Sequence, residues 1–202
     1  MPNSIELPAE DRRLQFVNVE LIFLAHGMTN IFATKNNKTL GETLEHKRYK
    51  ALADYSRKGY GQFLAMPLGS FLEELKSRDD SFYKRFLNPH GDERYCHFRM
   101  VDCAEKRLKG LYLYALEQSV VYIGRSFDPF GKRVDQGYGK IHPKNCFLDG
   151  QSTNCHLNSL IESRSSNIRF YVCSLRDNAE IERLERTLIQ QRKPEWNVAL
   201  TK

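Results

Sequence analysis

No apolar run in the sequence approaches the ~20 residues that a helix needs to cross a bilayer. The first residues, Met1 to Glu6, also lack the basic stretch and following apolar run of a secretory signal. Cysteine is scarce: the chain has five, an odd number without short paired spacing, which argues against the disulfide framework of a small secreted protein. We therefore expect a cytoplasmic protein with reduced thiols and no membrane partner.

The composition is that of a folded globular chain. Of the 202 residues, 41% are hydrophobic and 28% are charged, which is enough apolar material for one substantial core or two small domains. The net charge of +6 and the pI of about 9.0 suit a polyanionic partner such as nucleic acid. Many basic proteins bind no nucleic acid, so charge only supports an argument made from motifs.

Two runs rich in Leu, Tyr, Val and Ile predict a β-hairpin at residues 109–125. They flank the polar break Glu117-Gln118-Ser119, as two antiparallel strands joined by a short turn do. Gly110-Leu111-Tyr112 lies in the first run and Tyr122-Ile123-Gly124 in the second. We expect the paired strands to place Tyr112 and Tyr122 close together, and Tyr114, on the face of Tyr112, to pack as an ordinary aromatic residue.

Three further features follow the hairpin in order. Arg133 lies in a predicted helix at residues 130–136, Glu185 lies in a predicted final helix capped by Asp177, and Pro194-Glu195-Trp196-Asn197 ends the region. With the two tyrosines, this ordered set resembles the signature of the GIY-YIG nuclease superfamily over residues 110–197. Finer features, such as Tyr122-Ile123-Gly124-Arg125-Ser126, are similar to phage endonuclease II and its small type II restriction relatives.

The resemblance implies an α+β fold. Residues 106–202 would form the nuclease module, a three-stranded antiparallel sheet flanked by helices. Residues 1–105 resemble no family and are expected to be an α/β region that serves DNA recognition or dimerisation.

The implied activity is hydrolysis of phosphodiester bonds in double-stranded DNA by an endonuclease that uses Mg²⁺, with Mn²⁺ as a substitute. A site-specific enzyme of the type II restriction kind would cleave as a homodimer and would have a cognate DNA methyltransferase. The alternatives are a low-specificity or structure-selective nuclease of phage or repair type, and a catalytically inactive DNA-binding protein.

The resemblance also implies roles for individual residues. Tyr112 would take the proton from the attacking water with Tyr122 beside it, and Arg133 would hold the scissile phosphate. Tyr138 lies near the place where the family carries another catalytic tyrosine. His142, in the same loop, is a rival general base proposed from its residue type alone. The candidate DNA contacts in the module are Arg125, Lys132, Lys140, Ser152, Asn154 and Asn197.

Glu185 is the candidate metal ligand, and its place on the helix supports that role. It lies within the apolar face formed by Ile181, Leu184 and Leu188. A carboxylate turned toward apolar surroundings costs several kcal/mol unless a cation or metal compensates it. A structural ion pair with Arg133 is the plainer explanation, and one oxygen ligand for Mg²⁺ is the functional one.

The other elements are predicted from caps and periodicity. The N-terminal half is expected to contain strands at 16–23 and 95–101, a helix from the capping box Thr39/Glu42 to Gly59, another from the box Ser70/Glu73, and a short one at 82–87. The module should add a helix capped by Ser152 and a strand at 168–172. Lys47, Lys50 and Arg57 would lie on one side of the first helix, either as DNA-phosphate contacts or as a solvated face.

A zinc site is a weaker alternative for the loop after Arg133. His142, Cys146, Cys155 and His156 are all zinc-ligand types and lie within fifteen residues. Their spacing matches none of the usual paired ligand patterns. An ordinary loop with buried thiols is therefore the preferred interpretation.

Overall fold

The computed structural model describes residues 3–198, which form two compact units. Among the described residues, unit 1 comprises 3–25, 97–140 and 160–198, and unit 2 comprises 26–96 and 141–159. The sequence predicted one division near residue 105, whereas each of these units combines segments from both halves of the chain. Its first strands belong with the predicted nuclease module, and part of the predicted module belongs with unit 2.

Unit 1 is built on one antiparallel sheet of five strands. The strands are β1 (Ser4–Ala9), β2 (Arg12–Val19), β5 (Gly110–Leu116), β6 (Ser119–Ser126) and β7 (Ile168–Ser174). Their order is β1-β2-β7-β5-β6. The three predicted strands are present, and β2 extends the sheet because it pairs with β7 from Val17 to Val19. The chain is thus α+β, with a larger sheet than expected.

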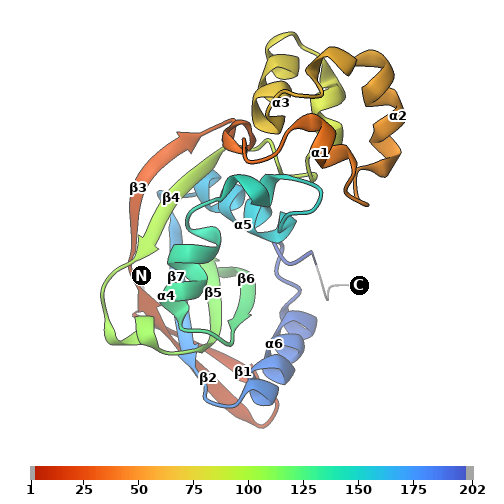
Figure 1. Cartoon of the computed structure of the whole chain (residues 1–202). Helices are drawn as coiled ribbons and strands as arrows, with labels where there is room; N and C mark the ends of the chain where they lie inside the picture. The colour runs from red at the N-terminus through yellow and green to blue at the C-terminus, as the bar shows by residue number, and fades with distance from the viewer. Residues whose placement is uncertain (1–2, 199–202) are drawn as a thin grey trace. The chain divides into compact units, whose positions relative to one another are not determined.

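Helices flank this sheet (Figure 1). The final helix, α6 (Asn178–Arg192), begins at Asp177, whose side chain accepts a hydrogen bond from the Glu180 amide at 2.7 Å, so the predicted cap is confirmed. Ile181, Leu184 and Leu188 of α6 share a buried core with strand residues such as Leu111, Leu113 and Ile123. The helix α4 (Phe130–Arg133) is shorter than predicted and continues as a π-helical turn, Val134–Tyr138.

The predicted hairpin is confirmed as β5–β6, with a shorter connection than expected. Ser119 belongs to β6, so the connection is only Glu117 and Gln118. Tyr112 lies opposite Gly124, and Tyr114 lies opposite Tyr122. Tyr112 and Tyr122 are therefore diagonal neighbours, and their ring centroids are 6.0 Å apart.

Unit 2 is mainly helical. It contains α1 (Leu40–Leu44), α2 (Lys50–Gly59) and α3 (Leu68–Ser77) around buried apolar residues that include Phe32, Leu72 and Phe86. The Thr39/Glu42 capping box is confirmed, but α1 ends after five residues and a turn separates it from α2. The Ser70/Glu73 box is wrong, because α3 begins at Leu68 and the Ser70 amide donates to Asn36 Oδ1 at 3.0 Å instead.

Three elements have residues in both units: β3 (Leu21–Met28) and β4 (Tyr95–Met100), which pair with each other, and α5 (Ser152–Ser163). The predicted strand at 16–23 is interrupted at Glu20, because β2 ends at Val19 and β3 begins at Leu21. Ser152 is the first residue of α5 rather than its cap. The short predicted helix at 82–87 is a 3₁₀ helix, Ser81–Phe86.

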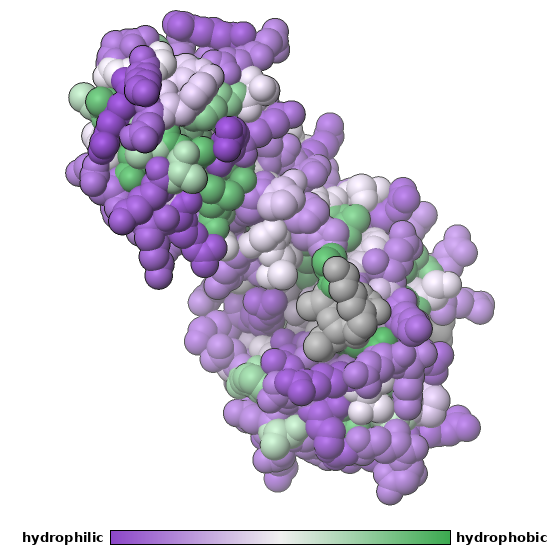
Figure 2. Space-filling model, turned by 90° about the vertical axis from the view of Figure 1, so that its right-hand side faces the viewer, coloured by the Kyte–Doolittle hydropathy of each residue, from purple (hydrophilic) through white to green (hydrophobic). Residues whose placement is uncertain are grey.

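The surface of both units is largely hydrophilic in the view of Figure 2. Within residues 3–198, no helix combines the length and apolarity needed to span a membrane. All five cysteines are described and unbridged, and four of them are buried.

Candidate active site

Most of the residues that carry the resemblance meet in one surface pocket of unit 1, with a volume of about 440 Å³. Its lining is Tyr112, Tyr122, Arg125, Arg133, Glu185, Arg186, Ile189 and Asn197. The hairpin, α4, α6 and the C-terminal segment each contribute to it. Pocket residues as far apart in sequence as Tyr112 and Asn197 are thus brought together from four separate elements. Arg186 and Ile189 also line the pocket, and the sequence analysis did not single them out.

The absence of a side chain at Gly124 makes room for Tyr112. A Cβ atom at position 124 would lie 2.6 Å from Tyr112 Cζ and 2.7 Å from its hydroxyl oxygen. Tyr112 is only 1% exposed, so its ring has little freedom to move aside. The cross-strand register, which pairs these two residues, therefore explains why a glycine follows Ile123 here.

If the chain cleaves DNA as the resemblance implies, Gly124→Ala should lower cleavage on the order of 10²-fold while duplex affinity stays unchanged, since a displacement of about 1 Å at a reacting group can cost that much. The measurement is plasmid nicking under single-turnover conditions. Gly59→Ala is the matched control, because a Cβ there meets no atom within 4 Å. Equal rates for the two variants would contradict the role of the Tyr112–Gly124 contact.

Arg133 is a fixed cation beside Tyr112. Its Nε donates to the Tyr112 hydroxyl at 3.4 Å, and its Cζ lies 5.3 Å from the centroid of the Tyr138 ring. The neighbouring Tyr112 hydroxyl raises the pKa of Arg133 against the opposing effect of burial, so the guanidinium remains charged. This placement suits a group that holds a phosphate, because a guanidinium can bind two phosphate oxygens at once.

Tyr138 makes a cation–π contact with Arg133 and is not among the residues that line the pocket. It is 0% exposed, and its hydroxyl lies 3.0 Å from that of Tyr114. Burial raises the pKa of Tyr138 well above its ordinary value. The predicted catalytic role is therefore not supported by its position, whereas the prediction that Tyr114 packs as an aromatic residue is confirmed.

His142 is not brought to Tyr112 within a common unit. It belongs to unit 2, where its Nδ1 accepts a hydrogen bond from the Lys144 amide at 3.2 Å and caps the 3₁₀ helix Pro143–Cys146. The imidazole thus has a local capping role. Sequence proximity to Arg133 made His142 a candidate, but the chain passes into the other unit after Lys140.

Glu185 is paired with Arg125, not with Arg133 as the plainer interpretation proposed. Arg125 Nη1 lies 2.6 Å from Glu185 Oε2, and Arg125 Nη2 lies 3.4 Å from Glu182 Oε1. The Glu185 side chain is 12% exposed. Burial raises the pKa of Glu185, and the charge of Arg125 offsets this only in part. Burial consequently disfavours the ionised form of Glu185. Its carboxylate is held at the pocket by its ion pair with Arg125.

This balance predicts a pH-dependent effect of Glu185→Gln on stability. Because the folded-state pKa is raised, the wild-type chain loses stability relative to the neutral variant as pH rises through that pKa. Glu185→Gln should therefore raise the melting temperature more at pH 7.5 than at pH 4. Glu182→Gln, which removes the more exposed partner of Arg125, is the control measured in parallel. Equal effects of Glu185→Gln at both pH values would contradict the burial cost.

The donor chemistry of the pocket fits Mg²⁺ bound largely through water and substrate. Mg²⁺ accepts one or two carboxylates, keeps several waters and takes phosphate oxygens. Glu185 supplies the carboxylate. Among residues 3–198, no three His, Cys, Asp or Glu side chains lie together as a metal-binding group, and this includes the alternative zinc set of His142, Cys146, Cys155 and His156.

The remaining candidate DNA contacts have varied surroundings. In unit 1, Asn197 bonds both the amide and the carbonyl of Ile123, at 2.9 and 2.8 Å, and so holds the C-terminal segment against β6. Lys132 is paired with Asp128 at 2.9 Å, and Lys140 is exposed. In unit 2, Asn154 is buried and bonds Gln151, Ser152 is half-buried, Lys47 and Lys50 are exposed, and Arg57 is paired with Glu45.

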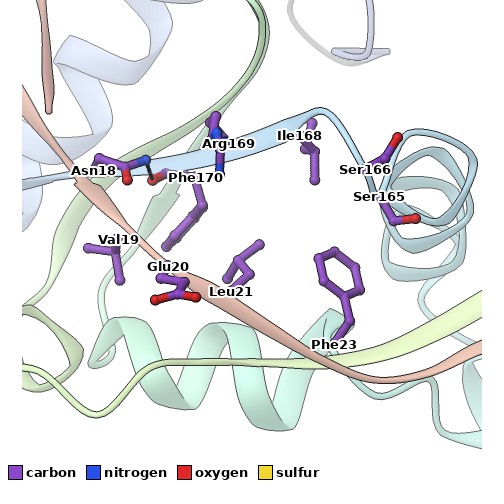
Figure 3. Close-up of a pocket in the computed structure, with 10 residues that line it drawn as sticks. All are labelled: Asn18, Val19, Glu20, Leu21, Phe23, Ser165, Ser166, Ile168, Arg169 and Phe170. Carbon is purple, nitrogen blue, oxygen red and sulfur yellow. Dashed lines mark hydrogen bonds between the residues drawn. The ribbon is translucent and has the colours of Figure 1, made fainter. Parts of the chain in front are cut away.

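A second pocket of unit 1, about 360 Å³, opens where β2 and β7 stop pairing after Val19. Figure 3 shows Ile168 and Phe170 pointing toward Leu21 and Phe23, with Arg169 turned the other way. Glu20 and Arg169 are the only ionisable side chains among the residues that line it. This pocket therefore lacks the tyrosines and the buried carboxylate that give the first pocket groups able to accept a proton and bind a metal.

Comparisons with protein-family models, with curated proteins and with solved structures found no match.

Proposed function

We propose that this chain is a GIY-YIG-type endonuclease that hydrolyses phosphodiester bonds in double-stranded DNA with Mg²⁺ as cofactor. The observation that carries the proposal is the convergence of Tyr112, Arg133 and Glu185 in one open pocket. These are a proton acceptor, a phosphate-binding cation and a metal ligand, the three kinds of group that phosphodiester hydrolysis needs.

In this mechanism Arg133 binds the non-bridging oxygens of the scissile phosphate and offsets the negative charge that develops in the transition state. The Tyr112 oxygen, acting as the phenolate next to that guanidinium, accepts a proton from the attacking water and becomes the hydroxyl. The water oxygen bonds to phosphorus as the bond from phosphorus to the leaving oxygen breaks, and the leaving oxygen takes a proton from solvent. Tyr122 closes the side of the pocket next to Tyr112.

Arg125 has a positioning role. It binds Glu185 Oε2, so Oε1 is the oxygen that Glu185 would present to a metal. Mg²⁺, when bound there, would supply Lewis-acid stabilisation of phosphate charge. The 2.6 Å ion pair thus orients a partly buried carboxylate and offsets part of the cost of burying its charge.

Site-specific cleavage of the type II kind is the preferred form of this activity. One pocket per chain cuts one strand at a time, so we propose a homodimer during double-strand cleavage. A restriction role would also need a cognate DNA methyltransferase. A low-specificity or structure-selective nuclease and a catalytically inactive DNA-binding protein are the other outcomes that the experiment must separate.

The test is digestion of several supercoiled plasmids and branched duplexes with Mg²⁺, with Mn²⁺ or with EDTA, followed by sequencing of the ends. Discrete fragments in Mg²⁺ would support the site-specific form, and a smear or cutting confined to branched DNA would support the other nuclease forms. Intact DNA that is nevertheless bound would indicate an inactive binder. Glu185→Ala protein prepared in the same way controls for a contaminating nuclease.

A further inference from the structure

A cluster of lysines lines a small pocket of unit 2, which the proposed chemistry does not use. The pocket has a volume of about 120 Å³. Its charged and titratable members are Lys35, Lys38, His46, Tyr49, Lys144 and Asp149. They come from two segments about a hundred residues apart in the sequence, which is why no sequence pattern indicated the pocket.

The pocket carries an excess of positive charge. The three lysines contribute +3, and Asp149 is the only acid among the residues that line it. Asp149 is also engaged, since its Oδ1 accepts a hydrogen bond from the Tyr49 hydroxyl at 2.6 Å. Burial lowers the pKa of Lys35, and the neighbouring Lys38 and Lys144 lower it further, although Asp149 opposes them. The lysines therefore repel one another at a site that one acid does not neutralise.

Lys35 is held in position within this cluster. Its Nζ lies 4.7 Å from the ring centroid of the buried Phe147, a cation–π contact. Its ammonium is also partly removed from solvent, which strengthens any charge-assisted hydrogen bond that it makes. The pocket is thus partly organised before a ligand binds.

The donor types favour a phosphate over a carboxylate. Ammonium groups act as compact point charges that approach an anion from several directions, whereas planar carboxylates are matched best by the fork of an arginine. The pocket has room for only a few water molecules at ~30 Å³ each, so it suits one phosphate group rather than a whole nucleoside.

We infer that the pocket formed by Lys35, Lys38 and Lys144 binds a single phosphate of the DNA backbone. The DNA assignment rests on the proposed function, whereas the phosphate site rests on the geometry of unit 2 alone. This surface is distinct from the exposed Lys47, Lys50 and Arg57, which would each meet a phosphate of their own; Arg57 is paired with Glu45.

The number of phosphates that the three pocket lysines contact can be measured from the salt dependence of binding. Each neutralised phosphate contributes ~0.9 to the slope of log affinity against log salt concentration. Replacing Lys35, Lys38 and Lys144 together by Gln should reduce the slope by about 1, because all three serve one phosphate, and each single replacement should already account for much of that loss. Three independent surface contacts would instead contribute up to ~3.

The experiment uses full-length protein carrying Glu185→Ala, a duplex of about 20 base pairs and EDTA, so that no DNA is cut. The charge-matched control replaces the exposed Lys58, Lys84 and Arg85 by Gln. A loss of about 1 in slope for the pocket variant but not for the control supports the inference, whereas a loss of ~3 would overturn the single-phosphate site. The same slope and affinity in the pocket variant, the control and the parent would overturn it.

A second measurement avoids variants that could disturb the fold. The pKa of the Lys35 ammonium in the parent protein is followed by NMR with inorganic phosphate, with duplex DNA, or with chloride at equal ionic strength. Phosphate and duplex should both raise this pKa, because an anion offsets the repulsion among the lysines. No change with either probe overturns the phosphate site, and a change with inorganic phosphate alone overturns the DNA assignment. Plasmid cleavage is scored separately, so failure of this inference is distinguishable from failure of the proposed function.

Discussion

Glu185→Ala should abolish cleavage and leave duplex affinity within a few-fold of the wild-type value. Glu185 is the one carboxylate among the residues that line the pocket, so its loss removes the proposed protein ligand of the metal. Losing several kcal/mol of transition-state stabilisation corresponds to at least a ~10³-fold lower rate. Affinity changes little because contacts to the phosphate backbone dominate binding. The measurements are single-turnover cleavage in Mg²⁺ and binding in EDTA.

Glu182→Ala is the control for this variant. Glu182 also pairs with Arg125, but at 3.4 Å and from a more exposed position outside the pocket lining. Exposed ion pairs contribute little to stability, so this variant should keep most of its activity. Full activity of Glu185→Ala, or equal loss in both variants, would remove Glu185 from the metal-binding role.

Tyr112→Phe should lower cleavage by ~10²- to 10⁴-fold, the range that general acid–base groups contribute. The variant keeps the aromatic ring that packs beside Tyr122 and removes only the hydroxyl next to Arg133. Duplex binding and the circular dichroism spectrum should be unchanged. The measurement is the single-turnover rate as a function of pH.

Tyr114→Phe is the matched comparison on the same strand face. Its hydroxyl is buried against that of Tyr138 and does not reach the pocket lining. The change should therefore cost about 1 kcal/mol of stability for one lost hydrogen bond and leave cleavage nearly normal. If both phenylalanine variants cut equally well, Tyr112 is not the proton acceptor.

Local sequence patterns predicted the parts of unit 1 whose structure depends on near neighbours. The polar break at Glu117 and Gln118 marked the hairpin, Asp177 marked the start of α6, and the spacing of Ile181, Leu184 and Leu188 put Glu185 on a buried face. Hydrogen bonds within a turn or a cap, and the 3.6-residue period of a helix, connect residues that are close in sequence. Patterns of this range can be recognised without knowing the rest of the fold.

Tertiary structure decided which distant groups meet. Arg125 rather than Arg133 binds Glu185, Tyr112 lies over Gly124, and three lysines from two remote segments share one pocket. The first strands of the chain join the sheet through β7, and residues 141–159 leave the module for unit 2. These outcomes depend on strand register and on the packing of elements far apart in sequence, and a shift of one residue in register would turn each side chain to the opposite face.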